Sequence, residues 1–312
     1  MLKKIKEFLL DMLFAPSGTA LLAFCVMLLI SIFNLLNTTL FLGSNATMLL
    51  FIPLAFGVPT FFFWLSRGGR KYIPTQHLEL PKKIHIPTIL FSSLVLCLGS
   101  TLINLIFIDG KYTDFSLYNA FFASRNGNIF NDLYLVLAFC IVPPIFEGLV
   151  FRGIFITENE RRGRLATTLF SALFFALLSF DAPIFPQRFF MGALLCIVLF
   201  ATESIATTVA LHVLYNFYAV FVEPTFIALK NVSSNFALFA YGWAILTLVA
   251  IFFLLSHLSR LYRKYSHDKF GESFVRSTPR ERTFWHLVEL SLSIPAIACY
   301  VLYIIVTLII GI

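Results

Sequence analysis

Four polar side chains interrupt apolar stretches of the sequence. Glu147 and Arg152 lie in PPIFEGLVFRGIF, and His212 and Asn216 lie in ALHVLYNF. A carboxylate, an imidazole and an amide can together take a proton from water and stabilise a developing oxyanion. His212 and Asn216 are four residues apart, so both side chains project from one face of a helix. These residue types predict a water-filled site, and an interhelical hydrogen bond is the structural alternative for His212 and Asn216.

The spacing of Glu147 and Arg152 predicts different directions for the two side chains. Five residues correspond to about 500° around an α-helix, so the two directions differ by about 140°. We expect Glu147 to face the interior of a helix bundle, either as a functional group or as a structural partner of another helix. We expect Arg152 to extend toward the cytoplasm or to anchor a neighbouring helix.

The composition indicates a polytopic membrane protein. Of 312 residues, 59% are apolar and only 12% are charged, and 38 are Phe. A soluble domain carries about 25% charged residues, so much of this apolar surface must face lipid. We interpret the five cysteines as small buried hydrophobic residues: Cys25, Cys97, Cys140, Cys196 and Cys299.

Nine apolar runs approach the roughly 20 residues that a helix needs to cross the hydrocarbon core. We therefore predict an all-α membrane bundle of about nine transmembrane helices, forming a single transmembrane domain over residues 1–312. The fifth and sixth helices are short. The runs cover residues 18–41, 46–66, 86–108, 132–156, 165–180, 189–202, 204–225, 236–256 and 287–311.

The positions of the basic residues predict the orientation in the membrane. The net charge is +7, but the basic residues form short clusters between apolar runs, which favours cytoplasmic loops over a nucleic-acid surface. With the N-terminus inside, 18 of the 23 Lys and Arg residues are cytoplasmic, Arg152 lies within a helix, and four are outside: Lys111, Arg125, Arg188 and Lys230. We expect an integral protein of a bacterial cell membrane, a retained first helix, and no nucleic-acid partner.

Two further expectations concern charged residues near the membrane surface. The segment 260–285 combines seven basic residues with aromatic ones, so we expect it to lie close to anionic lipid, with a solvated cytoplasmic loop as the alternative. Glu203 and Glu223 lie at the ends of predicted helices, where we expect both carboxylates to be solvated.

The motifs of residues 130–222 resemble those of the CPBP family, the CAAX-processing and bacteriocin-processing intramembrane endopeptidases. The family pattern is Glu-Glu-x-x-x-Arg, then Phe-x-x-x-His, then His-x-x-x-Asn. FEGLVFRG aligns Glu147 and Arg152 with the first motif, and ALHVLYNF aligns His212 and Asn216 with the third.

Two positions depart from that pattern. Gly148 replaces the second glutamate, and FALLS places Phe175 and Ser179 on the second motif, with serine in place of histidine. Glu147 and Ser179 each lie 16 residues from Gly163, the predicted turn between two antiparallel helices. This symmetry predicts that both residues lie at one depth, about 24 Å from the turn.

The resemblance implies roles for the aligned residues. Glu147 is then the base that activates a water molecule, and His212 and Asn216 stabilise the oxyanion. The hydroxyl of Ser179 could position the water, with help from Asp181, and a Ser179–His212 nucleophile pair is an alternative. No cofactor is evident; a catalytic zinc needs three protein ligands and the aligned set offers two, but a divalent metal is left open.

Three hypotheses for the function follow. The first is a diverged endopeptidase that cleaves a membrane-proximal, prenylated or bacteriocin-type peptide. The second is a catalytically inactive family member that acts as a scaffold or binds a membrane-protein partner through the same cavity. The third is a transporter with a polar site at the membrane midplane, although the sequence has no inverted repeat.

Overall fold

The computed structural model is built of helices, as the sequence predicts. It describes residues 17–40, 46–67, 80, 82–107, 117–160, 163–232, 236–268 and 280–310, and these ranges contain no strand. The all-α fold class is therefore confirmed.

The predicted apolar runs are largely helical, although several are broken into shorter pieces, and α5 and most of α14 lie outside these runs. Three pieces of the described chain are π-helical: η4 (Val136–Ile141), η5 (Leu149–Ile154) and η7 (Tyr218–Val222). The α-helices are α2 (Ser17–Leu40), α3 (Ala46–Ser66), α4 (Ile86–Phe107), α5 (Leu117–Ala123), α6 (Ile129–Leu135), α7 (Val142–Gly148), α8 (Phe155–Asn159), α9 (Arg164–Leu177), α10 (Phe185–Thr202), α11 (Ile205–Phe217), α12 (Glu223–Val232), α13 (Phe236–Asp268), α14 (Arg280–Ser291) and α15 (Ile294–Ile310), and a 3-10 turn, η3 (Lys83–His85), precedes α4.

The predicted number of nine spans is not confirmed. Among the described residues, six helices are long and apolar enough to cross a membrane. A seventh span results if α14 and α15, bent by 65° at their junction, are counted together. The helices at 18–33 and 164–177 are apolar but shorter.

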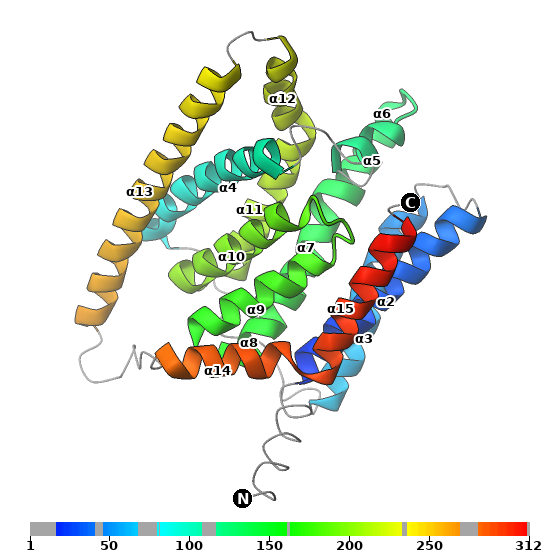
Figure 1. Ribbon diagram of the computed structural model, residues 1–312, viewed down its shortest axis with the longest axis horizontal. Helices are drawn as coiled ribbons and strands as arrows, with labels where there is room; N and C mark the ends of the chain where they lie inside the picture. The colour runs from blue at the N-terminus through cyan, green and yellow to red at the C-terminus, as the bar shows by residue number, and fades with distance from the viewer. Residues whose placement is uncertain are drawn as a thin grey trace, which may run out of the picture.

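The bundle has a central group of helices between two outer groups. Figure 1 shows α2 with α3 and α15 on one side and α4 with α13 on the other. Between them lie α7, α9, α10 and α11, and α10 contacts both α9 and α4. A cluster of aromatic rings joins η5 and α8 to α9: Phe151, Phe155, Phe170, Phe174 and Phe175.

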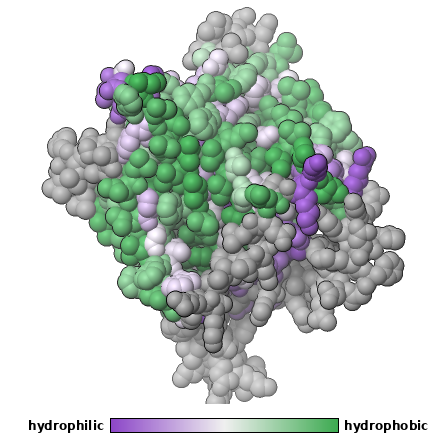
Figure 2. Space-filling view, turned by 180° about the vertical axis from the view of Figure 1, so that it is seen from behind, coloured by the Kyte–Doolittle hydropathy of each residue, from purple (hydrophilic) through white to green (hydrophobic). Residues whose placement is uncertain are grey.

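The outer surface suits a lipid environment. Apolar side chains cover most of the described surface in Figure 2, with hydrophilic side chains gathered in a few places. On α13, Leu238 is 72% exposed and Phe252 is 66% exposed. Exposed apolar groups at this density are expected where the solvent is hydrocarbon.

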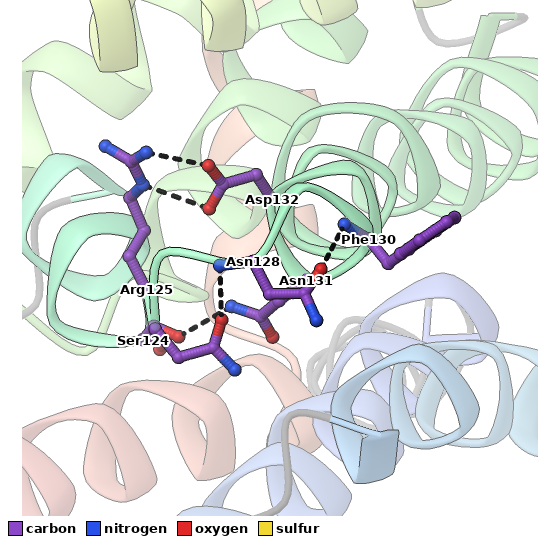
Figure 3. Close-up of polar contacts among 7 residues, drawn as sticks. Ser124, Arg125, Asn128, Phe130, Asn131 and Asp132 are labelled. Atoms are coloured by element: carbon purple, nitrogen blue, oxygen red, sulfur yellow. Dashed lines mark hydrogen bonds and ion pairs between the residues drawn. The ribbon is translucent and has the colours of Figure 1, made fainter.

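The loop before α6 is held by a compact set of polar contacts (Figure 3). Asn128 caps α6 by accepting a hydrogen bond from the N–H of Phe130 at 2.9 Å. Two guanidinium nitrogens of Arg125 donate to the carboxylate of Asp132 at 3.0 and 2.7 Å. These hydrogen bonds raise the pKa of Arg125 above its usual value.

An ion pair marks the other end of the bundle. Arg67, at the end of α3, lies 2.8 Å from Glu158 on α8, and Arg164 begins α9 directly after the turn. Arg67 and Arg164, both predicted to be cytoplasmic, thus lie at the same end of the bundle. Residues 269–279 of the basic segment 260–285 lie outside the described residues.

Candidate active site

Gly163 forms the predicted turn after which α9 packs against η5 and α8. Its φ is +110°, a conformation open mainly to glycine, and it precedes the first residue of α9. The N–H of Gly163 donates to the carbonyl oxygen of Glu160 at 3.0 Å. The chain then runs back as α9 along η5, so residues before and after the turn can share one site.

Glu147 and His212 face each other across the contact between α7 and α11. Glu147 Oε2 lies 3.6 Å from His212 Nε2, and the two side chains are 14% and 1% exposed. The predicted proximity of this carboxylate and this imidazole is therefore present in the structure. At 3.6 Å the two atoms are adjacent without forming a direct hydrogen bond.

Arg152 also points into this site, which contradicts the expectation that it extends toward the cytoplasm. It is only 1% exposed, its guanidinium carbon lies 4.3 Å from the centre of the Phe175 ring, and its charge acts on Glu147. The reason is the π-helical turn η5, which begins two residues after Glu147 and contains Arg152. A π-helical turn pairs i with i+5, so five residues bring Arg152 back toward the face of Glu147. The alternative expectation, that Arg152 anchors a neighbouring helix, agrees with this contact to α9.

Phe175 is the ring around which the charged groups gather. The edge of its ring meets the ring of His212 at a centroid distance of 5.7 Å and an angle of 80°. Gly192 allows α10 to approach this ring closely, because a Cβ there would lie 3.0 Å from Phe175 Cδ1. The aromatic position of the second motif thus packs between the charged residues and α10.

Arg188 is a functional candidate that the sequence reasoning missed. It lies in the first turns of α10 rather than in an outside loop, and its guanidinium carbon is 5.8 Å from the centre of the Phe175 ring. Its charge acts on both Glu147 and His212. Pro186 was the available signal, since proline favours the first helical positions and would have started the helix before Arg188.

Asn216 is fixed by a carbonyl group that proline residues leave free. Its Nδ2 donates to the carbonyl oxygen of Phe139 at 3.1 Å. The helical partners of that carbonyl, four and five residues on, would be Pro143 and Pro144, which have no N–H. One N–H of the Asn216 amide is therefore engaged, and the second can serve a ligand.

Several buried polar atoms of this cluster have no hydrogen-bond partner in the protein. Buried polar groups are normally paired, so this concentration is typical of a site that binds water or a polar ligand. No group of three or more His, Cys, Asp or Glu side chains suited to a metal occurs within the described ranges. The unpaired atoms are Glu147 Oε2, the three guanidinium nitrogens of Arg152, both ring nitrogens of His212, and Asn216 Oδ1.

The comparison with protein families points to the same residues. Residues 127–218 match the family described as Type II CAAX prenyl endopeptidase Rce1-like. This segment is therefore similar to the Rce1-like family. The match confirms the predicted resemblance to the intramembrane endopeptidases and runs from the loop before α6 to just beyond Asn216. Searches of curated proteins and of solved structures gave no match.

The Rce1-like segment lacks the second carboxylate because α11 occupies its place. A Cβ at Gly148 would lie 2.6 Å from Val209 Cγ2, closer than Cβ atoms approach other groups. Gly148 therefore allows α7 and α11 to pack directly against each other. This contact sits three residues before His212 on α11, beside the Glu147–His212 pair.

Ser179 is placed differently from the predicted second motif. The helix α9 ends at Leu177, and Ser179 lies in the turn that follows. Its hydroxyl donates to the carbonyl oxygens of Ala176 at 2.8 Å and Asp181 at 3.2 Å. Among the hydrogen bonds of the described residues, none joins Ser179 to Glu147 or His212, so its role in positioning water stays a prediction.

Proposed function

We propose that this protein is an intramembrane endopeptidase of the Rce1-like type that hydrolyses a peptide bond with water activated by Glu147. The substrate class is a membrane-proximal peptide, prenylated or bacteriocin-type. The observation that best supports this proposal is the Glu147–His212 pair, whose side chains lie 3.6 Å apart within the segment that matches the family. We also propose that the chain forms one transmembrane domain with a cytoplasmic N-terminus.

The reaction needs a base, a site for the oxyanion, and an acid for the leaving group. Glu147 takes one proton from water, and the resulting hydroxide attacks the carbonyl carbon of the scissile bond. The oxyanion accepts hydrogen bonds from His212 and from the second N–H of the Asn216 amide. Glu147 then gives its proton to the leaving amine, the C–N bond breaks, and a new carboxyl group and amine result.

The two arginines contribute positive charge to the same site. Arg152 and Arg188 both act on Glu147 from beside the Phe175 ring. Preorganised cations near a developing oxyanion are effective in an interior with few competing water molecules. They supply electrostatic stabilisation where the family's second carboxylate and second-motif histidine are missing.

A second candidate function is that of an inactive Rce1-like protein that binds a membrane-protein partner or acts as a scaffold. The specific observation in its favour is the filled space beside Gly148, together with the local hydrogen bonds of Ser179. Both features remove groups that would help to activate water. The polar cluster around Glu147 would then serve binding alone.

A proteolysis screen distinguishes these candidates. The full chain, purified and reconstituted in lipid, is incubated with a library of membrane-proximal peptides with and without a prenyl group, and Glu147→Ala is the control. The endopeptidase proposal expects cleavage products that disappear with Glu147→Ala. Absence of cleavage across the library would contradict it and favour the binding function.

A further inference from the structure

A second buried carboxylate lies apart from the Glu147 site. We expected Glu223 to be solvated at a helix end, but it is only 2% exposed and lies within the span formed by residues 205–228. The expectation was wrong because η7 and α12 continue α11 without a break. A charged side chain within a span is costly to insert and usually faces a partner or a ligand.

The π-helical turn η7 and helix α4 build a polar cluster around Glu223. Thr101 Oγ1 donates to Glu223 Oε1 at 3.1 Å and lies 2.7 Å from the hydroxyl of Tyr218. Because the single proton of Thr101 goes to Glu223, Tyr218 must donate to Thr101. Tyr218 and Glu223 are five residues apart, so η7 places them on one face, as η5 does for Glu147 and Arg152.

Asn104 completes this cluster from α4, one turn after Ser100 and Thr101. It is 3% exposed, it interacts with Glu223, and its Oδ1 atom has no hydrogen-bond partner. Thr101 is fully buried. An unpaired amide oxygen beside a carboxylate indicates a missing cation rather than a missing acceptor, since both groups offer oxygen lone pairs.

The charges around Glu223 define the ligand. No ion pair of the described residues includes Glu223, and the groups that act on it are Thr101 and Asn104. All candidate ligand atoms are oxygens, which suit hard cations. One carboxylate balances one positive charge, whereas a divalent ion would leave a buried charge without compensation.

We propose that Glu223, Thr101, Asn104 and Tyr218 bind a monovalent hard cation, with sodium as the first choice. The cation takes the unpaired Asn104 oxygen and the Glu223 carboxylate as ligands and holds α4 against the continuous helix formed by α11, η7 and α12. A hydrogen bond between Ser100 and Tyr215, 2.7 Å long, lies next to this site on the same two elements. The proposal does not depend on the endopeptidase reaction.

The test is the thermal unfolding midpoint of the full chain, purified in detergent, as choline is replaced by sodium at constant ionic strength. We expect the midpoint to rise and saturate, by on the order of 5 °C when sodium far exceeds its dissociation constant. Glu223→Gln and Thr101→Val should lose this rise. Thr101→Ser keeps the hydroxyl and should retain it, as should Glu147→Gln, which lies in the other site.

Two outcomes would overturn the proposal. Equal midpoints in sodium and choline for the unmodified chain would mean that Glu223 is held as a neutral acid by its hydrogen bonds. A sodium-dependent rise that persists in Thr101→Val, or in Glu223→Gln, would place the cation elsewhere. Asn104→Asp gives a further readout, since a second carboxylate should make calcium stabilise the chain more than sodium does.

Discussion

Gly148 on α7 lies against Val209 on α11, and this contact is a steric reason for the lack of a side chain at position 148. Val209 Cγ2 would lie 2.6 Å from a Cβ at this position, whereas Val209 Cβ would lie at 3.9 Å. Replacing the valine by alanine would therefore leave an ordinary contact. The side chain that position 148 can accommodate therefore depends on the size of residue 209.

Gly148→Ala tests this coupling without adding charge. We expect it to lower the free energy of unfolding by about 1–3 kcal/mol, the usual cost of overpacking. Adding Val209→Ala should recover most of that loss relative to Val209→Ala alone. Thermal unfolding of the four chains measures the coupling, and strictly additive effects would contradict the contact.

Restoring the family's carboxylate should then require both changes. We expect Gly148→Glu with Val209→Ala to cleave peptide faster than the unmodified chain, by about tenfold or more, because a positioned acid–base group contributes roughly 10²–10⁴-fold. Gly148→Glu alone should fold poorly. A double variant that folds and shows no gain would mean that a second carboxylate at this position does not assist water activation here.

Most residues of the site could be identified from the sequence, but the directions in which their side chains point could not all be predicted. An ionisable or amide group in an apolar run is conspicuous, so Glu147, His212 and Asn216 stood out. Arg188 did not, because a cation near the end of a run resembles a loop charge until its helix is known to start earlier. The engagement of Asn216 with Phe139 also depends on a contact between distant segments.

At the scale of elements, the π-helical turns decide which side chains meet. Each of η5 and η7 allows a pair of residues five apart to share one face: Glu147 with Arg152, and Tyr218 with Glu223. The carbonyl of Phe151, within η5, accepts a hydrogen bond from Ser171 on α9 at 2.8 Å. A neighbouring helix thus satisfies a backbone group of the turn that shapes the Glu147 site.

Deleting one residue from η5 and inserting one residue into it should affect the stability of the protein to different extents. Deleting Leu149, which is 42% exposed, leaves Arg152 four residues from Glu147, about 40° away around an α-helix. Inserting one alanine after Leu149 makes the separation six residues, about 120° away.

We expect the deletion to retain the folded state and the insertion to destabilise it more, by the roughly 2.5–3.5 kcal/mol of a misplaced charge in a span. Thermal unfolding of the two purified variants compares these costs. An insertion that is tolerated as well as the deletion would contradict the role assigned to η5.

The direction of Arg152 was mispredicted for this same reason. A rotation of 100° per residue holds only in a regular α-helix, and nothing in the local letters LVFRGI announces a π-helical turn. The break at Val142 was better marked, because Pro143 and Pro144 cannot donate to the preceding turn. Gly163 was also identifiable, since it lies between two apolar runs beside basic residues.

At the scale of the whole molecule, hydropathy was sufficient to predict where helices form. It was not sufficient to predict how many of these helices cross the membrane. Long apolar runs fold as helices because the backbone must pair its own polar groups in lipid. Whether a short helix such as α9 crosses the membrane depends on tilt and on packing by neighbours, which composition does not encode. The bend between α14 and α15 has a local signal instead, because Pro295, the second residue of α15, has no N–H to donate to the preceding turn.

The predicted orientation of the molecule is testable with two exposed positions at opposite ends of the bundle. Asn126 lies in the loop before α6, and Ser66 ends α3 beside Arg67. In a chain whose five cysteines are replaced, we expect a membrane-impermeant maleimide to label Asn126→Cys from outside intact cells, while Ser66→Cys is labelled only after lysis. The reverse pattern would contradict a cytoplasmic N-terminus.

The most direct test of the endopeptidase function is the initial rate at which the best peptide from the screen is cleaved by three forms of the reconstituted chain. These are the unmodified chain, Glu147→Gln, and Glu158→Gln, whose glutamate pairs with Arg67 at the end of the bundle. We predict that Glu147→Gln lowers the rate at least about 10²-fold. Glu158→Gln should stay within about twofold, because partly exposed ion pairs contribute little. Cleavage by Glu147→Gln at the unmodified rate would contradict the assignment of Glu147 as the base.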